Sequence, residues 1–394
     1  MAVLRRLNEA GYKAYLVGGS VRDLLLGMRP KDFDIATDAH PEKIRRLFRN
    51  SRLIGKRFRL VHVFFGREII EVSTFRAHHP EKAHPEGHKS DSGMLLRDNI
   101  FGTIEDDAWR RDFSINALYY DAASATVIDY TGGMEDLEKK TIRILGDPIN
   151  RYKEDPVRML RAVRLAAKLD FCFEAATEQA LHTLKDELKH ISSARLFDVV
   201  LKIFYCGRAV EAFNLLQQYG FFALLFPQTD AALSENQGDR TLALIMQSCK
   251  NTDARIANDQ SLNPAFLFAV LLWPCLQEKK QQFKKEGHRP FHALHMAINK
   301  VIRKQTQIIA VPRRYTTIME EIWSLQHPLI ERSKRRISTT FAHPRFRAAY
   351  DFLVLRFESG ELALKEAVEW WEDFQTLPAE EQLAMTSPAK SAHE

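Results

Sequence analysis

The feature that most restricts the fold is a change of hydrophobic period near Asp155. Before this point, short apolar runs with strand-like character, such as 61–65, are interspersed with helical patterns. After it, apolar residues recur at helical spacing, as in Val157 and Leu160, with short breaks as far as Trp371. The chain is therefore expected to be α+β, with a small mixed-sheet head followed by an all-α remainder.

Length and composition are those of a globular protein. With 394 residues, of which 45% are hydrophobic, the chain can bury a large core and form two or three domains. Its longest apolar run, 265–276, is shorter than the roughly 20 residues that cross a membrane, and it contains Pro274. The first residues lack the apolar stretch of a secretory signal. We expect a cytoplasmic protein without a membrane partner.

The four cysteines are widely separated and form no C-x-x-C pair. This spacing argues against a zinc cluster or a disulfide framework. We expect reduced core residues at Cys172, Cys206, Cys249 and Cys275.

Positive charge is concentrated in one stretch, 279–336, which holds 14 Lys or Arg residues against 4 Glu. Such a surface attracts polyanions over long range. Charge alone does not decide between nucleic acid, an acidic protein and lipid.

Two glycines, Gly18 and Gly19, stand between an apolar run at 14–17 and an amphipathic helical pattern. Glycine allows the backbone to approach a ligand closely, and free amide groups can cradle phosphates. Arg22 could neutralise phosphate charge. Two glycines before a helix are also common as a simple turn.

Two acids, Asp32 and Asp34, follow at a spacing of two on an expected strand, 32–36. Successive strand residues point to opposite faces, so both carboxylates should project together while Phe33 and Ile35 pack inward. Carboxylates roughly 7 Å apart can bind Mg²⁺, with Mn²⁺ as an alternative. For an isolated D-x-D, an exposed strand end is the competing interpretation.

This ordered set, Gly18 and Gly19, Arg22 and the acid pair, resembles the signature of the nucleotidyltransferase superfamily related to DNA polymerase beta. The resemblance is to the branch that contains bacterial poly(A) polymerases and CCA-adding enzymes. The segment 110–118 is similar to the second motif of that family, and 129–137 to its third, a flexible hinge. The resemblance implies that Arg111 meets phosphate and that Asp112 lies near ribose or metal.

A polar stripe opens the helical part, because four residues step by three from Asp155. A solvated face with i,i+3 ion pairs is the simpler interpretation. In the related enzymes this helix is a neck whose Asp and Arg hydrogen-bond the incoming base. The resemblance thus implies base recognition by Asp155, Arg158, Arg161 and Arg164.

A third carboxylate is expected to complete the metal site or to activate the 3′ hydroxyl. Asp112 is the preferred candidate. Glu71 is the alternative, although an acid alternating with apolar strand residues could equally be solvated. The histidine-rich stretch 77–93 is expected to be a mobile loop rather than a zinc site; its histidines are His78, His79, His84 and His88.

The resemblance implies a division into five parts. These are a nucleotidyltransferase head (1–146), a helical neck for base recognition (147–192), a helical body (193–288), a basic helical RNA-binding region (289–376) and a disordered tail (377–394).

Within the branch, the segments 53–63 and 94–102 look like those of bacterial poly(A) polymerases. The function implied is template-independent, Mg²⁺-dependent transfer of AMP from ATP to RNA 3′ ends, which promotes RNA processing and decay. The partners implied are RNA and, more distantly, RNA-decay machinery. A CCA-adding enzyme is the alternative, and a non-catalytic RNA-binding protein is the third hypothesis. The expected roles are metal binding by Asp32 and Asp34, assistance at the 3′ hydroxyl by Asp112, and triphosphate binding by Gly18, Gly19, Arg22 and Arg111.

Overall fold

The computed structural model describes residues 1–55, 59–77, 100–234 and 238–386, and its chain forms two compact units, Met1–Leu188 and Lys189–Glu394. The division lies close to the boundary expected at residues 192 and 193. The head and neck therefore share one unit, and the other helical parts share the second. The five-part division remains a prediction.

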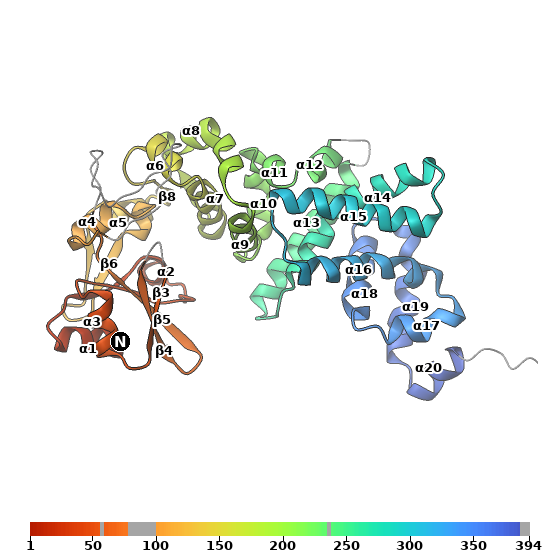
Figure 1. Ribbon diagram of the computed structural model, residues 1–394, viewed down its shortest axis with the longest axis horizontal. Helices are drawn as coiled ribbons and strands as arrows, with labels where there is room; N and C mark the ends of the chain where they lie inside the picture. Colours follow the sequence, from red (N-terminus) through yellow and green to blue (C-terminus); the bar gives the residue numbers. More distant parts are fainter. Residues whose placement is uncertain (56–58, 78–99, 235–237, 387–394) are drawn as a thin grey trace, which may run out of the picture. The chain divides into compact units, whose positions relative to one another are not determined.

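Unit 1 is built on a seven-stranded mixed sheet (Figure 1). Its strands are β1 (Ala14–Val17), β2 (Asp34–Thr37), β3 (Ser51–Ile54), β4 (Leu60–Phe65), β5 (Glu68–Thr74), β6 (Leu118–Asp121) and β7 (Thr126–Asp129). They lie in the order β3-β4-β5-β2-β1-β6-β7. β1 is antiparallel to β2 and β6, whereas β2 is parallel to β5. The expected mixed-sheet head is confirmed.

Short helices and a small second sheet complete unit 1. The helices are α1 (Ala2–Glu9), α2 (Gly19–Leu25), α3 (Pro41–Leu47), α4 (Ile104–Trp109), α5 (Gly133–Glu138), α6 (Pro148–Glu154), α7 (Val157–Leu169) and α8 (Ala175–Leu184), with β8 (Thr141–Ile142) pairing with β9 (Cys172–Phe173). α2 packs on β1 and β6, and α3 packs on β3, β4 and β5. The β3 strand and α3 were not expected from the sequence.

One face of the large sheet is built from laterally paired residues. Asp34 pairs with Val17 on one side and with Glu71 on the other, so these three side chains share a face. On that face Val17 belongs to a core cluster that includes Ala108 of α4. Asp34 and Glu71 therefore continue, across the sheet, the row of side chains to which the buried Val17 belongs.

The second strand begins at Asp34 rather than at Asp32, which corrects the expected bounds. The physical reason is the end of β1: Val17 pairs with Asp34, and Gly18 then turns the chain at φ +77°, so residue 33 has no partner on β1. Phe33 consequently stays 38% exposed, contrary to the inward packing expected, whereas Ile35 is buried as expected.

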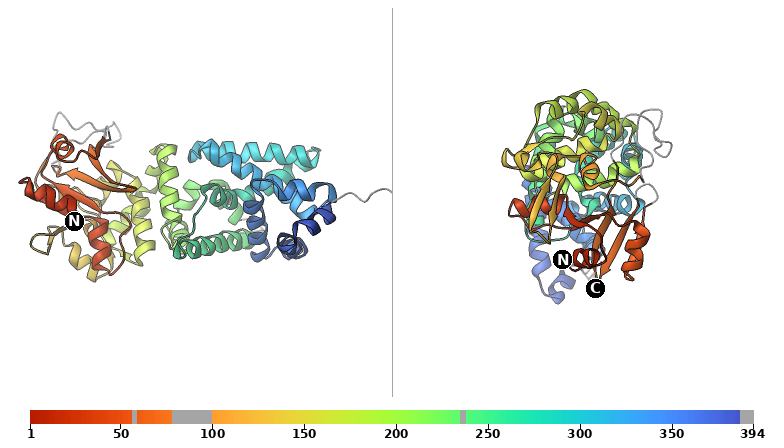
Figure 2. Two further views of the ribbon diagram at one scale, coloured as in Figure 1. Left: turned by 90° about the horizontal axis from the view of Figure 1, so that it is seen from below. Right: turned by 90° about the vertical axis from the view of Figure 1, so that its left-hand side faces the viewer.

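Unit 2 consists of helices, as the helical period predicts (Figure 1). They are α9 (Ser193–Phe204), α10 (Ala209–Gln218), α11 (Phe221–Leu225), α12 (Pro227–Leu233), α13 (Gly238–Ala257), α14 (Pro264–Lys285), α15 (Pro290–Ile308), α16 (Arg313–Glu331), α17 (Lys334–Phe341), α18 (Phe346–Glu358), α19 (Lys365–Thr376) and α20 (Ala379–Thr386). α14 packs along α15 (Figure 2). The boundary expected between residues 288 and 289 thus falls in the turn between two helices of one unit.

The apolar run 265–276 forms the buried part of α14, which continues through Pro274. In the part of the chain that the structure describes, no helix is both long and apolar enough to span a membrane.

Several expectations for individual segments differ from the structure. α20 occupies Ala379–Thr386, where disorder was expected, and the Gln382 side chain donates to the Phe374 carbonyl at 2.9 Å. Cys249 and Cys275 are core residues, but Cys172 is exposed. The expected loop at 77–93, with its four histidines, and the motif at 94–102 fall almost entirely outside the described residues, as do 387–394.

The expected hinge at 129–137 is a tightly bonded turn. The Asp129 carboxylate accepts hydrogen bonds from the amides of Thr131, Gly132 and Met134 at 2.9 to 3.0 Å. These bonds hold the pKa of Asp129 below its ordinary value although partial burial opposes ionisation. At Gly133 a Cβ atom would lie only 2.3 Å from the Ser114 carbonyl oxygen.

Gly133→Ala should therefore displace backbone and lower the free energy of unfolding by about 3 kcal/mol. Gly11 is the matched control, since its φ is +84° but a Cβ there would meet no atom within 4 Å. Gly11→Ala should cost only the left-handed strain of about 1 kcal/mol. Urea unfolding followed by circular dichroism measures both, and equal losses would contradict this account of the turn.

Candidate active site

Three carboxylates gather at one end of β2. Asp34 begins the strand, Glu71 is its register partner on the parallel strand β5, and Asp32 lies two residues earlier in the connection that precedes β2. Neighbouring strands are about 4.8 Å apart, so Asp34 and Glu71 side chains leave the sheet side by side. Glu71 also lies 3.2 Å from Nε2 of His62, its antiparallel partner on β4.

The carboxylates of this cluster repel one another. Burial, the charge of Glu71 and, more weakly, the charge of Asp32 raise the pKa of Asp34 to about 6, while Arg111 opposes the rise. At Asp34 the repulsion from the two other acids thus outweighs the attraction of Arg111. Hard oxygen donors with an excess of negative charge are the surroundings that Mg²⁺ and Mn²⁺ prefer.

The cluster is open. Among the described residues, no three His, Cys, Asp or Glu side chains stand close enough to form a ready metal cage. A magnesium ion usually keeps several waters and takes substrate phosphate oxygens as further ligands, so an open set of carboxylates still fits it.

Arg111 lies beside the glycine turn. A Cβ atom added at Gly18 would be in van der Waals contact with its Nη1 atom at 3.4 Å, and the φ of +77° at this position favours glycine. Arg111 donates to Asp107 at 3.0 Å and to the Tyr119 hydroxyl at 3.0 Å. These partners raise its pKa although burial acts in the opposite direction. The cation is therefore fixed and permanently charged.

Arg22 lies against the glycine turn, where a Cβ atom added at Gly19 would be 3.4 Å from its Nη2 atom. Its side chain is buried, only 5% of the residue being exposed, and its Nε atom donates to Asp23 at 2.8 Å. A second donor, Nη1, bonds the Asn116 side chain. Arg22 thus holds the base of the glycine turn together.

Asp112 is buried and already engaged. Its Oδ1 atom accepts from the Phe113 amide at 2.9 Å and from Asn116 at 3.2 Å. Nη2 of Arg161 lies 3.0 Å from Oδ2, close enough for an ion pair but without hydrogen-bond alignment. Although burial opposes ionisation, Arg161 and Asn116 hold the pKa of Asp112 below its ordinary value.

A second contact holds α7 at Lys168, two helical turns beyond Arg161. Lys168 donates to Oδ2 of Asp23 at 2.8 Å. The contacts join into one chain between two points on α7, which we call the charge chain. Its members in order are Lys168, Asp23, Arg22, Asn116, Asp112 and Arg161.

The four residues that were expected to recognise the base make separate sets of contacts in the structure. Arg161 belongs to the charge chain, whereas Arg158 donates to the Arg151 carbonyl at 2.7 Å and pairs with Glu154 at 3.0 Å. Asp155 stands between α6 and α7, and its Oδ1 accepts from the Val157 amide at 3.3 Å. Arg164 is half-buried further along α7.

Arginines surround the start of α6 and α7. Arg151 donates to the carbonyls of Arg110 and Arg111, at 2.7 and 2.5 Å. Burial and the charges of its neighbours Arg76, Arg111, Arg151 and Arg158 lower the pKa of Arg110. A concentration of mutually repelling cations is suited to a polyanionic ligand such as a triphosphate.

The sequence identified the acids, the glycine turn and Arg111, which the structure brings to one end of the sheet. It assigned no role to Asp23, Asn116 or Lys168. The first two stand inside motifs singled out from the sequence, so position was a usable signal. Lys168 had none, because a lysine on a helix is ordinarily a solvated residue.

Three family models match the chain. They describe the poly A polymerase head domain (residues 14–143), a probable RNA and SrmB-binding site of polymerase A (170–233) and the polymerase A arginine-rich C-terminus (286–394).

Curated relatives match almost the whole chain. It is 49% identical to poly(A) polymerase I of Escherichia coli O157:H7, over 98% of this chain and 84% of that protein. The poly(A) polymerase I of Haemophilus influenzae is 44% identical over 99% of this chain and 87% of its own length. By contrast, the CCA-adding enzyme of Lactobacillus helveticus, 39% identical, matches only 55% of this chain and 52% of its own.

Solved structures have the same fold. The CCA-adding enzyme of Bacillus stearothermophilus in complex with CTP gives a TM-score of 0.60 at 23% identity, covering 98% of this chain and 87% of that one. The CCA-adding enzyme of Thermotoga maritima complexed with tRNA gives 0.61 at 19%, covering 100% and 86%.

The charge chain predicts strong coupling between Asp23 and Lys168. Asp23→Asn should lower the free energy of unfolding by about 3 kcal/mol, because it leaves Arg22 buried beside a neutral group. In a double-mutant cycle with Lys168→Met, the coupling energy should exceed about 1 kcal/mol. The exposed pair Glu135 and Lys139 is the control and should show no measurable coupling. Equal behaviour of the two pairs would refute the charge chain.

Proposed function

This chain belongs to the bacterial poly(A) polymerase I family of nucleotidyltransferases, and we propose that it transfers AMP from ATP to RNA 3′ ends without a template, using Mg²⁺ or Mn²⁺. The observation that carries the mechanism is the register of Asp34 with Glu71 beside the turn at Gly18. In sequence, poly(A) polymerases match nearly the whole chain, whereas the CCA-adding enzyme of Lactobacillus helveticus matches about half of it, which supports adenylate addition.

Asp32 and Asp34 would hold the metal ion, with Glu71 as the third carboxylate. Glu71 is favoured over Asp112 because it raises the pKa of Asp34 from the neighbouring strand, whereas Asp112 is paired with Arg161. A bound divalent ion supplies charge neutralisation for the triphosphate and lowers the pKa of the attacking hydroxyl.

The turn at Gly18 and Gly19 admits the triphosphate, and Arg111 neutralises its charge. Arg111 suits this role because Asp107 and Tyr119 fix its position before a ligand arrives, so little ordering is needed on binding. Arg22 acts indirectly, by holding the turn through Asp23 and Asn116.

Asp155 and Arg158 stand at the start of α7, where they can meet the base edge. The adenine edge offers an amino donor and a ring acceptor, which suit a carboxylate and a guanidinium. Arg161 supports them by anchoring α7 to Asp112, and Arg164 extends the same helix.

The proposed reaction is a direct displacement at phosphorus and needs no covalent intermediate on the protein. The RNA 3′ oxygen forms a bond to the α-phosphorus of ATP, the bond from that phosphorus to the bridging oxygen breaks, and pyrophosphate leaves. The hydroxyl proton passes to a carboxylate of the cluster or to water. The protein's contribution is positioning and charge stabilisation.

RNA is the proposed polymeric substrate, and the basic stretch 279–336 supplies long-range attraction for it. We place the reaction in the cytoplasm, and RNA-decay proteins remain candidate partners, in keeping with the match at 170–233 to a probable RNA and SrmB-binding site.

The activity is tested by incubating purified protein with a labelled oligoribonucleotide and one nucleotide at a time. ATP alone with Mg²⁺ should give long tails. Addition of two cytidines and one adenosine would instead support a CCA-adding enzyme. No incorporation with either metal ion would leave a non-catalytic RNA-binding protein.

Substitution of the two candidate acids separates their roles. Glu71→Gln should lower kcat by about 100-fold or more with the melting temperature almost unchanged, since it removes a charge at the reacting centre. Asp112→Asn should chiefly lower the melting temperature, because it removes the buried carboxylate on which Asn116 and Arg161 converge.

Glu68→Gln is the matched control, as Glu68 is an exposed acid on the same strand as Glu71. It should behave as the wild type. Full activity in Glu71→Gln, with loss of kcat in a stably folded Asp112→Asn, would reverse the assignment.

A further inference from the structure

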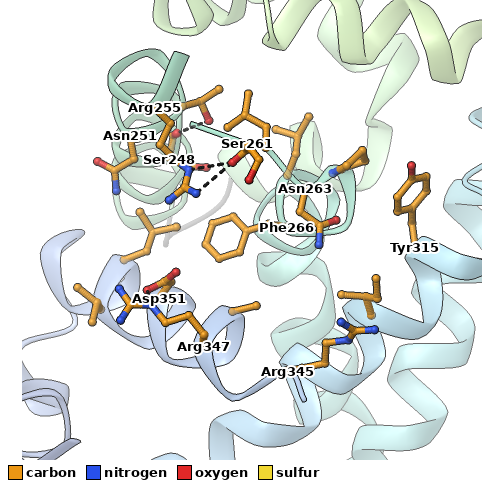
Figure 3. A pocket seen from close by; sticks show the side chains of 18 of the residues that line it. Ser248, Asn251, Arg255, Ser261, Asn263, Phe266, Tyr315, Arg345, Arg347 and Asp351 are labelled. Carbon is orange, nitrogen blue, oxygen red and sulfur yellow. Dashed lines mark hydrogen bonds and ion pairs between the residues drawn. The ribbon is translucent and has the colours of Figure 1, made fainter. Parts of the chain in front are cut away.

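Unit 2 contains a cavity of about 910 Å³ to which the proposed chemistry assigns no role. Its walls come from α13, the segment 258–263, the first turn of α14, the first turn of α16 and α18 (Figure 3). This volume is that of a site for a nucleotide-sized ligand. Most of the cavity lies outside 170–233, the range that matches a probable RNA and SrmB-binding site.

An aromatic ring lies at the centre of the cavity. Phe266 projects from α14 and is only half-buried, with its ring edge-to-face against Phe352 at 5.9 Å between centroids (Figure 3). Tyr315, from α16, adds a second half-buried ring. A ring held from behind and open to a cavity is a platform on which a nucleic-acid base can stack.

Three arginines surround this platform. The guanidinium of Arg255 donates to the Ser261 carbonyl at 3.0 Å, Nε of Arg345 lies 3.1 Å from Glu321, and Nε of Arg347 lies 2.9 Å from Asp351. Each contact orients the guanidinium yet uses only part of its five N–H donors. The remaining donors can bind phosphate without the cost of fixing a mobile side chain.

Hydrogen-bond acceptors also line the cavity. Ser248 and Asn251 line the cavity from α13, and Asp351 faces them from α18. Asp351 is 35% exposed at its side chain. A carboxylate beside an aromatic platform can accept a hydrogen bond from the amino group of adenine or cytosine.

The lining of the cavity carries charges of both signs, which limits the class of ligand that it can bind. Asp351 and Glu358 in the lining disfavour an acidic peptide, which would need a wall of cations alone. Stacking, phosphate and amino recognition together match a nucleotide. The α16 helix that supplies Tyr315 opens with Arg313 and Arg314 inside the basic stretch 279–336, so a polyanionic strand has a charged path to the cavity.

We propose that this cavity binds a nucleotide of the RNA strand, with its base on Phe266 and its phosphate at Arg345 and Arg347. The inference rests on the proposed function only in taking RNA as the ligand. It assigns to unit 2 a specific strand contact in addition to non-specific charge attraction.

The test measures binding of a 5′-fluorescein-labelled A15 oligoribonucleotide by anisotropy, without ATP, at several salt concentrations. Phe266→Leu keeps apolar volume but removes the stacking face, and it should weaken binding about tenfold with no change in the salt slope. Arg347→Gln should reduce the slope of log affinity against log salt by about 0.7, as expected for one lost phosphate contact. Arg347→Lys should retain the slope.

Phe291→Leu is the matched control, because Phe291 is an exposed ring on α15 outside the cavity. It should bind as the wild type. The inference is overturned if Phe266→Leu, with an unchanged melting temperature, binds RNA within twofold of this control. It is also overturned if the variant loses binding of free ATP in equilibrium dialysis while RNA affinity stays constant.

Steady-state tailing gives an independent readout. Phe266→Leu should raise KM for RNA and leave KM for ATP unchanged. If the wild type binds RNA through this cavity but adds no nucleotide, the proposed function fails while the inference stands.

Discussion

The geometry of unit 1 depends on the charge chain that ties α2 to α7. Four of its six members carry full charges in buried or half-buried positions, and each carboxylate is shared between two partners. Removing Asp23 leaves Arg22 buried without a counter-charge, which is far more costly than losing a surface ion pair. Because Arg161 and Lys168 lie two helical turns apart, the chain fixes both the position and the direction of α7. The glycine turn and the helix that begins beside Asp155 are thereby held as one structure.

The carboxylate cluster has the opposite electrostatic character. In the charge chain every acid has a cation and the pKa of Asp112 is lowered, whereas at the cluster the pKa of Asp34 is raised by burial and by neighbouring acids. A protein tolerates such repulsion where a ligand supplies the missing positive charge. This contrast supports the proposal that Asp112 holds the site in place and that Glu71 acts in it.

Much of this was predictable from local pattern. The hydrophobic period predicted the head and the helical remainder, and the apolar run at 14–17 coincides with β1. Pairing across the sheet was not, because register is set by long-range contacts: only the structure shows that Val17 faces Asp34 and that Phe33 is left exposed. The contact of Lys168 with Asp23, the neighbour and partner of Arg22, joins residues 145 positions apart, so no local pattern could predict it.

The central claim is that the charge chain holds α7, the proposed base-reading helix, in place relative to the acids proposed to bind the metal ion. It is tested most directly by the ratio of kcat/KM for ATP to that for CTP in Lys168→Met, with Lys168→Arg as the conservative variant. The account predicts that the ratio falls on the order of tenfold in Lys168→Met and recovers in Lys168→Arg, since α7 loses one of its two grips while Asp155 and Arg158 are intact. An unchanged ratio, with both kcat/KM values lowered equally or not at all, would contradict it.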